Sequence, residues 1–165
     1  MGKKTYLILF IIFYSLSAGA FNSEWILATN EENVKVWLRK GNSEVTGSVE
    51  KRTRQTLTNW STIKNGSYFK KYEAQKQKML SLIGVTHWQT TQSTWKKSKS
   101  YFFLSIEGSY TDSSQQDIVF IEEHFYFPTQ TIQLLHTRPR TLIEGDKLGK
   151  EILNEMKKEV GIKSE

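Results

Sequence analysis

The 165-residue sequence contains no cysteine. This absence excludes disulfide bonds, thiolate zinc sites and cysteine nucleophiles together. Stability must therefore come from the packing of side chains.

Motifs of the common enzyme classes are also missing. The chain has no G-x-S-x-G elbow, phosphate-binding loop, H-E-x-x-H zinc motif, calcium-binding loop or dinucleotide fingerprint. His87 lies in a predicted strand and His136 ends another, where a structural role is the commoner one. We therefore expect a protein that is not an enzyme and that carries no cofactor.

The N-terminus has the layout of a secretory signal peptide. Lys3 and Lys4 precede an uncharged apolar run that ends in small residues with an A-x-A pattern at Ala20. We expect residues 1–20 to be cleaved and residues 21–165 to form a single domain with no membrane span; an uncleaved anchor is the alternative. Because animal secreted domains commonly contain disulfides, a cysteine-free exported chain favours the bacterial periplasm or exterior.

Charge is unevenly distributed along the chain. Residues 21–99 carry 14 Lys and Arg against 6 Asp and Glu, whereas residues 100–165 carry 7 against 11. This asymmetry predicts an electropositive face. Outside the cytoplasm, the expected partner is an envelope protein or an anionic lipid or glycan rather than nucleic acid.

Apolar periodicity and turn signals predict an α+β fold with an antiparallel sheet. The expected N-terminal elements are a hairpin over 24–29 and 34–40, a third strand over 43–52, and a central helical segment over 57–63 and 67–83. Four strands should then form a meander over 85–97, 101–111, 118–127 and 131–137. A C-terminal helix over 146–160 closes the chain.

Both long helices have an apolar stripe. In the central helix, the residues expected in the core are Tyr68, Tyr72, Met79 and Leu82 or Ile83. The C-terminal helix carries Leu148, Ile152, Met156 and Val160 at four-residue spacing, with Leu153 beside them. We expect this second stripe to cover the apolar face of the meander.

The second and third strands of the meander contain the acidic residues that most resemble a reaction centre. A register with Tyr110 opposite Asp117 gives an apolar face of Phe102, Leu104, Ile106, Tyr110, Val119, Ile121 and Phe125. Glu107, Glu122 and His124 then share the opposite face, where they are candidates for binding a divalent cation or for acid–base chemistry. Three ligands without a fourth are weak evidence, so ordinary strand polarity is the preferred interpretation and no metal is expected.

Glu123 turns toward the apolar face in this register. It is expected at a sheet end, in a pair with Arg138 or Arg140, or beside a bulge that shifts the alternation. The sequence leaves these three alternatives open.

Trp37 is the candidate binding residue among the five tryptophans. It alternates with Val36 and Leu38, which are expected to be buried, and it lies between Lys35 and Arg39. An exposed indole between two cations suits a membrane interface or an anionic glycan. The predicted ligand- or partner-binding residues are therefore Lys35, Trp37 and Arg39.

The order of elements between Trp25 and Val160 resembles the PsbP-like fold of photosystem accessory proteins and their bacterial relatives. The resemblance implies an α/β/α sandwich with helices on both sides of a sheet. It also implies a non-catalytic accessory or binding domain.

The segment EWILATNEENVKVWLRK is similar to the opening of START lipid-transfer domains, where a tryptophan precedes a V-K-V-aromatic-x-Arg strand. Trp25, Val34, Lys35, Val36, Trp37 and Arg39 carry this second resemblance. It implies a carrier whose cavity, between the sheet and the closing helix, is lined by Phe102, Leu104, Ile106, Ile121 and Leu148.

These observations give one preferred function and two alternatives. The preferred function is an exported, non-catalytic accessory or interaction domain that binds a protein or an anionic envelope component. The first alternative is a START-like carrier of a lipid or other apolar ligand. The second is a metal- or acid/base-dependent enzyme at Glu107, Glu122 and His124.

Overall fold

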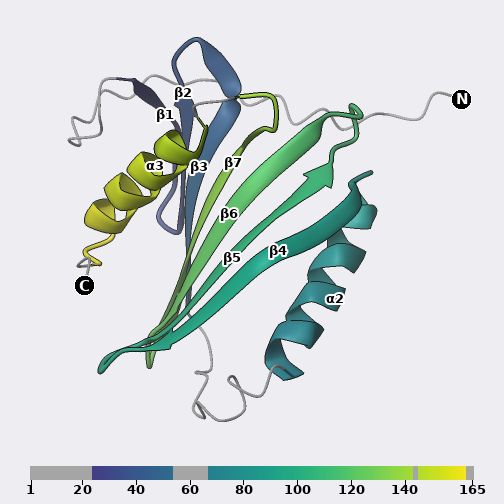
Figure 1. Ribbon diagram of the computed structural model, residues 1–165. Helices are drawn as coiled ribbons and strands as arrows, with labels where there is room; N and C mark the ends of the chain where they lie inside the picture. The colour runs from purple at the N-terminus through teal and green to yellow at the C-terminus, as the bar shows by residue number, and fades with distance from the viewer. Residues whose placement is uncertain (1–23, 54–66, 143–144, 163–165) are drawn as a thin grey trace, which may run out of the picture.

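The computed structural model describes residues 24–53, 67–142 and 145–162. Within these ranges the chain forms a seven-stranded sheet and two helices (Figure 1), which confirms the α+β class with an antiparallel sheet. The predicted signal peptide and the helical segment predicted at 57–63 lie outside the described residues. Neither described helix is long and apolar enough to cross a membrane.

All neighbouring strands in the sheet are antiparallel, in the order β1-β2-β3-β7-β6-β5-β4. The strands are β1 (Trp25–Asn30), β2 (Val34–Arg39), β3 (Asn42–Thr53), β4 (Thr86–Lys97), β5 (Phe102–Thr111), β6 (Asp117–Tyr126) and β7 (Gln130–Pro139). The predicted hairpin, third strand and meander are all present. Pairing of β3 with β7 joins the two halves of the chain into one sheet.

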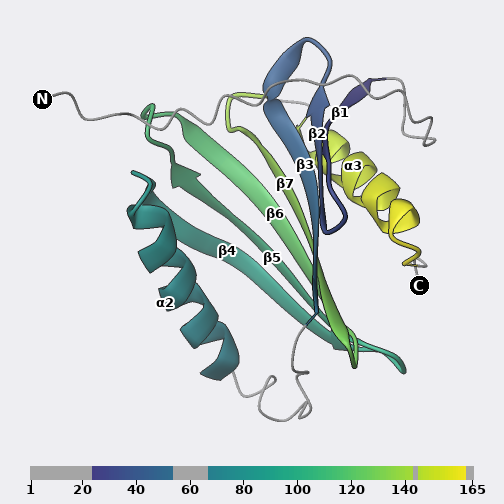
Figure 2. The ribbon, with the colours of Figure 1, turned by 180° about the vertical axis from the view of Figure 1, so that it is seen from behind.

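The helices α2 (Ser67–Ser81) and α3 (Gly145–Glu159) lie on opposite sides of the sheet (Figures 1 and 2). Helix α3 covers β3 and β7, whereas α2 runs along the half of the sheet formed by β4, β5 and β6. We call the two sides of the sheet the α3 face and the α2 face. Each face has its own apolar core.

The core on the α3 face is built by the predicted stripe of α3. The buried residues are Trp25, Trp37, Val45, Val49, Phe125, Ile132, Leu134, Ile152, Leu153, Met156 and Ile162. The expectation that α3 covers the apolar residues of β5 is wrong, because Leu104 and Ile106 belong to the other core, beneath α2.

Two glycines allow α3 to approach the sheet closely. A Cβ atom at Gly47 would lie 2.6 Å from Cγ1 of Ile152, and one at Gly149 would lie 2.9 Å from Cδ2 of His136. Separations below 3.0 Å require a neighbouring atom to shift. At these two points the space between α3 and the sheet is filled.

His136 is buried at this contact, and its environment favours the neutral ring. Its Nδ1 lies 2.8 Å from the carbonyl oxygen of Thr46, and because a carbonyl only accepts, Nδ1 is the protonated nitrogen. Burial is the main cause that lowers the pKa of His136 to about 4, and the nearby charge of Arg138 adds to it.

Acidification should therefore destabilise the protein through His136. The unfolded chain binds a proton near the ordinary pKa of 6.5, before the folded chain does, so the free energy of unfolding falls as the pH drops from about 6.5 toward 4. The full loss is about 3 kcal/mol. Urea unfolding across this range measures it. The His136→Asn variant, which can still donate to Thr46 but does not titrate, should show a flatter profile, and an unchanged slope would contradict the assignment.

The residues of α2 that pack on the sheet differ from those predicted. Tyr68, Phe69, Tyr72 and Leu80 pack on the sheet residues Trp88, Leu104, Ile106, Phe120 and Tyr126. By contrast, Met79, Leu82 and Ile83 are exposed, with 61%, 81% and 68% of their surfaces accessible. Tyr68, Tyr72, Lys76 and Leu80 follow one another at four-residue steps, so the inward-facing line of the helix includes a lysine.

This correction predicts opposite outcomes for two leucines that are two residues apart. Leu82→Ser should change the free energy of unfolding by no more than about 0.5 kcal/mol, because the side chain is already in water. Leu80→Ser should lower it by about 1 to 2 kcal/mol. Urea unfolding of the two variants tests the assignment, and equal losses would show that the end of α2 is buried.

Candidate functional site: a groove between α2 and the sheet

The register of β5 and β6 differs by one residue from the prediction. Tyr110 pairs with Ile118, and Thr111 with Asp117. The turn is closed by Asp112, whose Oδ1 accepts hydrogen bonds from the backbone nitrogens of Ser114 and Gln116 at 2.8 and 2.9 Å. Because side chains alternate along a strand, a shift of one residue moves every β6 side chain to the other face.

This shift separates the three residues predicted to share a face. Glu107 pairs with Ile121, whose side chain lies against α3, whereas Glu122 pairs with Ile106 and lies beneath α2. Glu122 and His124 remain together, and Glu107 is exposed on the opposite face. Within the described ranges, no group of three or more His, Asp or Glu residues is arranged to hold a metal ion.

Glu123 fits none of the three alternatives left open by the sequence. It faces α3, where its Oε2 lies 2.9 Å from Nζ of Lys157. The α3 face therefore accommodates this carboxylate through an ion pair with the helix that covers it.

The residues predicted to bind a ligand or partner also face α3. Trp37 is 3% exposed and part of the core, so the expectation of an exposed indole is wrong. Lys35 forms an ion pair with Glu159 at the end of α3, and Arg39 lies 4.0 Å from Glu24. All three side chains are engaged with their own fold.

The cavity implied by the START resemblance is not lined as expected. Leu104 and Ile106 are fully buried beneath α2, whereas Ile121 lies against α3. The sheet therefore separates residues that were expected to line one cavity.

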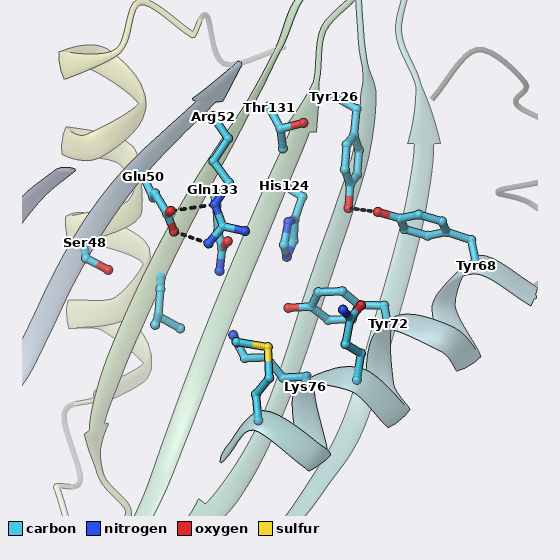
Figure 3. Close-up of a pocket in the computed structure, with 13 residues that line it drawn as sticks. Ser48, Glu50, Arg52, Tyr68, Tyr72, Lys76, His124, Tyr126, Thr131 and Gln133 are labelled. Carbon is cyan, nitrogen blue, oxygen red and sulfur yellow. Dashed lines mark hydrogen bonds and ion pairs between the residues drawn. The ribbon is translucent and has the colours of Figure 1, made fainter. Parts of the chain in front are cut away.

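A groove of about 430 Å³ lies instead on the α2 face, between α2 and the strands β3, β7 and β6 (Figure 3). Its walls include Tyr68, Tyr72 and Lys76 from α2, His124 and Tyr126 from β6, and Gln133 from β7. The mixture of aromatic rings with amide, hydroxyl and ammonium groups gives the groove both apolar surfaces and hydrogen-bonding groups.

Glu122 lies beneath the groove and is a shared hydrogen-bond acceptor for residues in its walls. Its side chain is fully buried, and Oε1 accepts hydrogen bonds from the hydroxyl of Tyr72 at 2.5 Å, Nζ of Lys76 at 3.2 Å and the side-chain amide of Gln133. Nε2 of His124 lies 3.0 Å from the same oxygen. Four residues that line the groove are therefore positioned by one carboxylate.

The electrostatics of Glu122 favour the ionised form. Burial alone would raise its pKa, but the contacts with His124, Lys76 and Tyr72 outweigh burial and lower the pKa to about 2. The pKa of Tyr72 is raised, first by burial and then by the charge of Glu122. At neutral pH the pair is a carboxylate that accepts from a neutral phenol.

The aromatic rings of the groove are fixed by contacts with one another. The imidazole of His124 stacks on Tyr126, with ring centres 5.7 Å apart and an angle of 8° between the planes. Tyr72 meets His124 edge-on at 5.2 Å, and the hydroxyl of Tyr68 donates to that of Tyr126 at 3.1 Å. These contacts limit the number of rotamers available before any ligand arrives.

The rim on the β3 side carries a bidentate ion pair. Nε and Nη2 of Arg52 donate to Oε1 and Oε2 of Glu50 at 2.5 and 2.6 Å (Figure 3). Both side chains remain substantially exposed, at 53% and 37%. Arg52 thus lies at the edge of the groove with its outer nitrogen, Nη1, outside the pair.

Sequence reasoning singled out Glu122 and His124 but missed the groove. The available signal was Lys76, which falls in line with Tyr68, Tyr72 and Leu80 on the inward side of α2. A lysine in such a line predicts a buried acidic partner, because an unpaired buried charge is costly. Glu122 is that partner.

Comparisons with known proteins do not assign a family. No family model and no curated protein matches the chain. Among solved structures, a crystal structure from Bacteroides thetaiotaomicron VPI-5482 is similar to this chain, with 5% sequence identity and a TM-score of 0.47. The alignment covers 80% of this chain and 40% of that one, so the match spans about two fifths of that protein.

Proposed function

We propose that the protein is an exported, non-catalytic binding domain that receives a small polar ligand in the groove between α2 and the sheet. The observation that carries the proposal is the buried carboxylate of Glu122, which positions Tyr72, Lys76, His124 and Gln133 in the walls. Preorganised polar groups around a concave surface are typical of small-molecule sites, and about 430 Å³ falls within their usual range of volumes.

The chemistry of the site supports binding over catalysis. A general base works best when its pKa is close to the operating pH, whereas the pKa of Glu122 lies far below its usual range. This carboxylate is therefore a weak base, and its Oε1 is already the shared acceptor of Tyr72, Lys76 and Gln133. A non-catalytic role also agrees with the accessory or binding function implied by the PsbP-like order of elements.

The walls favour a small polar molecule over a lipid chain. Tyr68 and Tyr72 are partly exposed and offer ring surfaces, but the floor and rim carry charged and amide groups that an acyl chain would cut off from water without supplying hydrogen bonds. A ligand that combines a flat surface with hydrogen-bonding groups satisfies both kinds of wall.

Nuclear magnetic resonance can test this proposal on the purified protein without the predicted signal peptide. We expect at least one of four millimolar probes, glucose, uridine, tyrosine or benzoate, to cause saturable shifts in residues that line the groove. Gln133→Ala should weaken these shifts, whereas Gln92→Ala, on the exposed surface of β4, should not. The proposal fails if no probe shifts the groove residues, or if the shifts are insensitive to Gln133.

A further inference from the structure

We propose that the ligand of the groove is a small anion on a flat ring, an aromatic or cyclic carboxylate or phosphate, whose charged group is held between Arg52 and Lys76. This inference rests on the proposed binding function and adds the chemistry of the ligand. It depends on which hydrogen-bonding groups the folded chain has already used.

The carboxylates around the groove are already engaged by the protein. Glu122 is fully buried beneath the walls, and its Oε1 accepts from Tyr72, Lys76 and Gln133. At the rim, each oxygen of Glu50 accepts a hydrogen bond from Arg52. Oε1 of Glu122 and both oxygens of Glu50 are thus already engaged, and Oε2 of Glu122 has no hydrogen-bond partner but is buried out of contact with solvent. A cationic ligand would have to compete with the existing bonds.

Lys76 and Arg52 each have more N–H donors than their bonds to Glu122 and Glu50 use. A lysine ammonium has three N–H donors and a guanidinium has five. Lys76 donates to Glu122 through one of its three, and Arg52 donates to Glu50 through Nε and Nη2. The guanidinium edge formed by Nη1 and Nη2 is therefore open to an incoming anion, in the geometry that suits carboxylate and phosphate.

The positions of the two cations fit a single ligand between them. Arg52 approaches from β3 and Lys76 from α2 (Figure 3). Gln133 and His124 come from β7 and β6, the two strands that follow β3 in the sheet. The partly exposed rings of Tyr68 and Tyr72 form the adjoining wall and pack against the stacked rings of Tyr126 and His124, which are each 4% exposed. A ring that carries one anionic substituent can contact this wall while its charged group reaches a cation.

Matched benzene derivatives separate charge from shape. Benzoate and phenyl phosphate carry the anion, benzamide keeps the ring and the planar group without charge, and benzylamine reverses the sign. Calorimetry should show benzoate or phenyl phosphate binding about ten-fold more tightly than benzamide. The advantage should shrink as salt is raised, because Arg52 is exposed to solvent. Whichever of benzoate and phenyl phosphate binds more tightly shows whether the groove prefers a carboxylate or a phosphate.

Two substitutions localise the effect. Arg52→Gln removes an exposed charge at little expected cost to folding, and it should reduce the affinity of the anion toward that of benzamide. Lys78→Gln removes a charge from the exposed surface of α2 and should leave binding unchanged. Groove shifts in nuclear magnetic resonance spectra confirm the location of each complex.

Four other outcomes of these experiments would overturn the inference. If benzamide or benzylamine binds in the groove as tightly as the anions, the preference for an anion is wrong. If Arg52→Gln has no effect, Arg52 does not hold the charged group and the inference is wrong. In both cases the binding function stands. The inference is also wrong, and the binding function stands, if glucose or uridine binds in the groove and none of the benzene derivatives does. If no probe of either set shifts the groove residues, both the inference and the proposed function fail.

Discussion

Replacing Glu122 with alanine should lower the free energy of unfolding by about 3 to 5 kcal/mol. The substitution leaves the ammonium of Lys76, the hydroxyl of Tyr72 and the amide of Gln133 without their shared acceptor. Donors that lose a buried partner retain the cost of desolvation. Urea unfolding monitored by tryptophan fluorescence measures the loss.

Glu107 provides a matched control for this experiment. It lies one strand away, on the opposite face, and is exposed. Glu107→Ala should change the free energy of unfolding by no more than about 0.5 kcal/mol. Similar losses for the two alanine variants would show that Glu122 is not the buried centre of a network.

Gly108→Ala should also lower the free energy of unfolding, by about 3 kcal/mol or more. A Cβ atom at Gly108 would lie 2.3 Å from the backbone oxygen of Gln89 and 2.6 Å from Cζ of Phe120. The first contact is with the neighbouring strand itself, so β4 would have to move away from β5. Phe120 is also fixed, because its ring stacks on Trp88 at 5.7 Å.

Gly41→Ala separates steric overlap from backbone effects. A Cβ atom at Gly41 would have no other atom within 4 Å, but the backbone has φ of +76°, so the cost should be the conformational penalty of about 1 kcal/mol. Thermal unfolding of the two variants side by side measures the difference. If Gly108→Ala is as mild as Gly41→Ala, β5 does not approach β4 and Phe120 as described.

The strands and the closing helix were predictable because their local signals agree with their final environment. Alternation in β5 and the four-residue spacing of Leu148, Ile152 and Met156 each describe one buried face. In β2 the alternation predicted the strand but the wrong buried face, because Trp37 is buried. Gly161, with φ of +73°, ends the chain's last helix as its position suggests.

The site was harder to predict because it depends on one residue of register. The turn after Thr111 is closed by the side chain of Asp112, and Gln115 adopts a φ of +64° that is uncommon for residues other than glycine. Nothing in the alternation of β5 or β6 alone reveals this geometry. A slip of one residue was enough to place Glu122 and His124 on the wrong face.

The inward line of α2 was missed for a related reason. Lys76 breaks the apolar pattern between Tyr72 and Leu80, whereas Met79 and Ile83 continue an apolar pattern that the fold does not bury. The charge of Lys76 is compensated by Glu122, a residue 46 positions away. Pairing between distant residues of this kind is set by the assembled sheet, and periodicity within a helix does not report it.

The central claim is that a buried, ionised Glu122 holds the walls of the groove. A carbon-13 nuclear magnetic resonance titration of the side-chain carboxyl groups tests this claim most directly, with the signal of Glu122 assigned by comparison with Glu122→Gln. We predict that the signal keeps the shift of a carboxylate as the pH falls well below 4, until the protein unfolds. Protonation of Glu122 at or above its ordinary pKa in the folded protein would contradict the account.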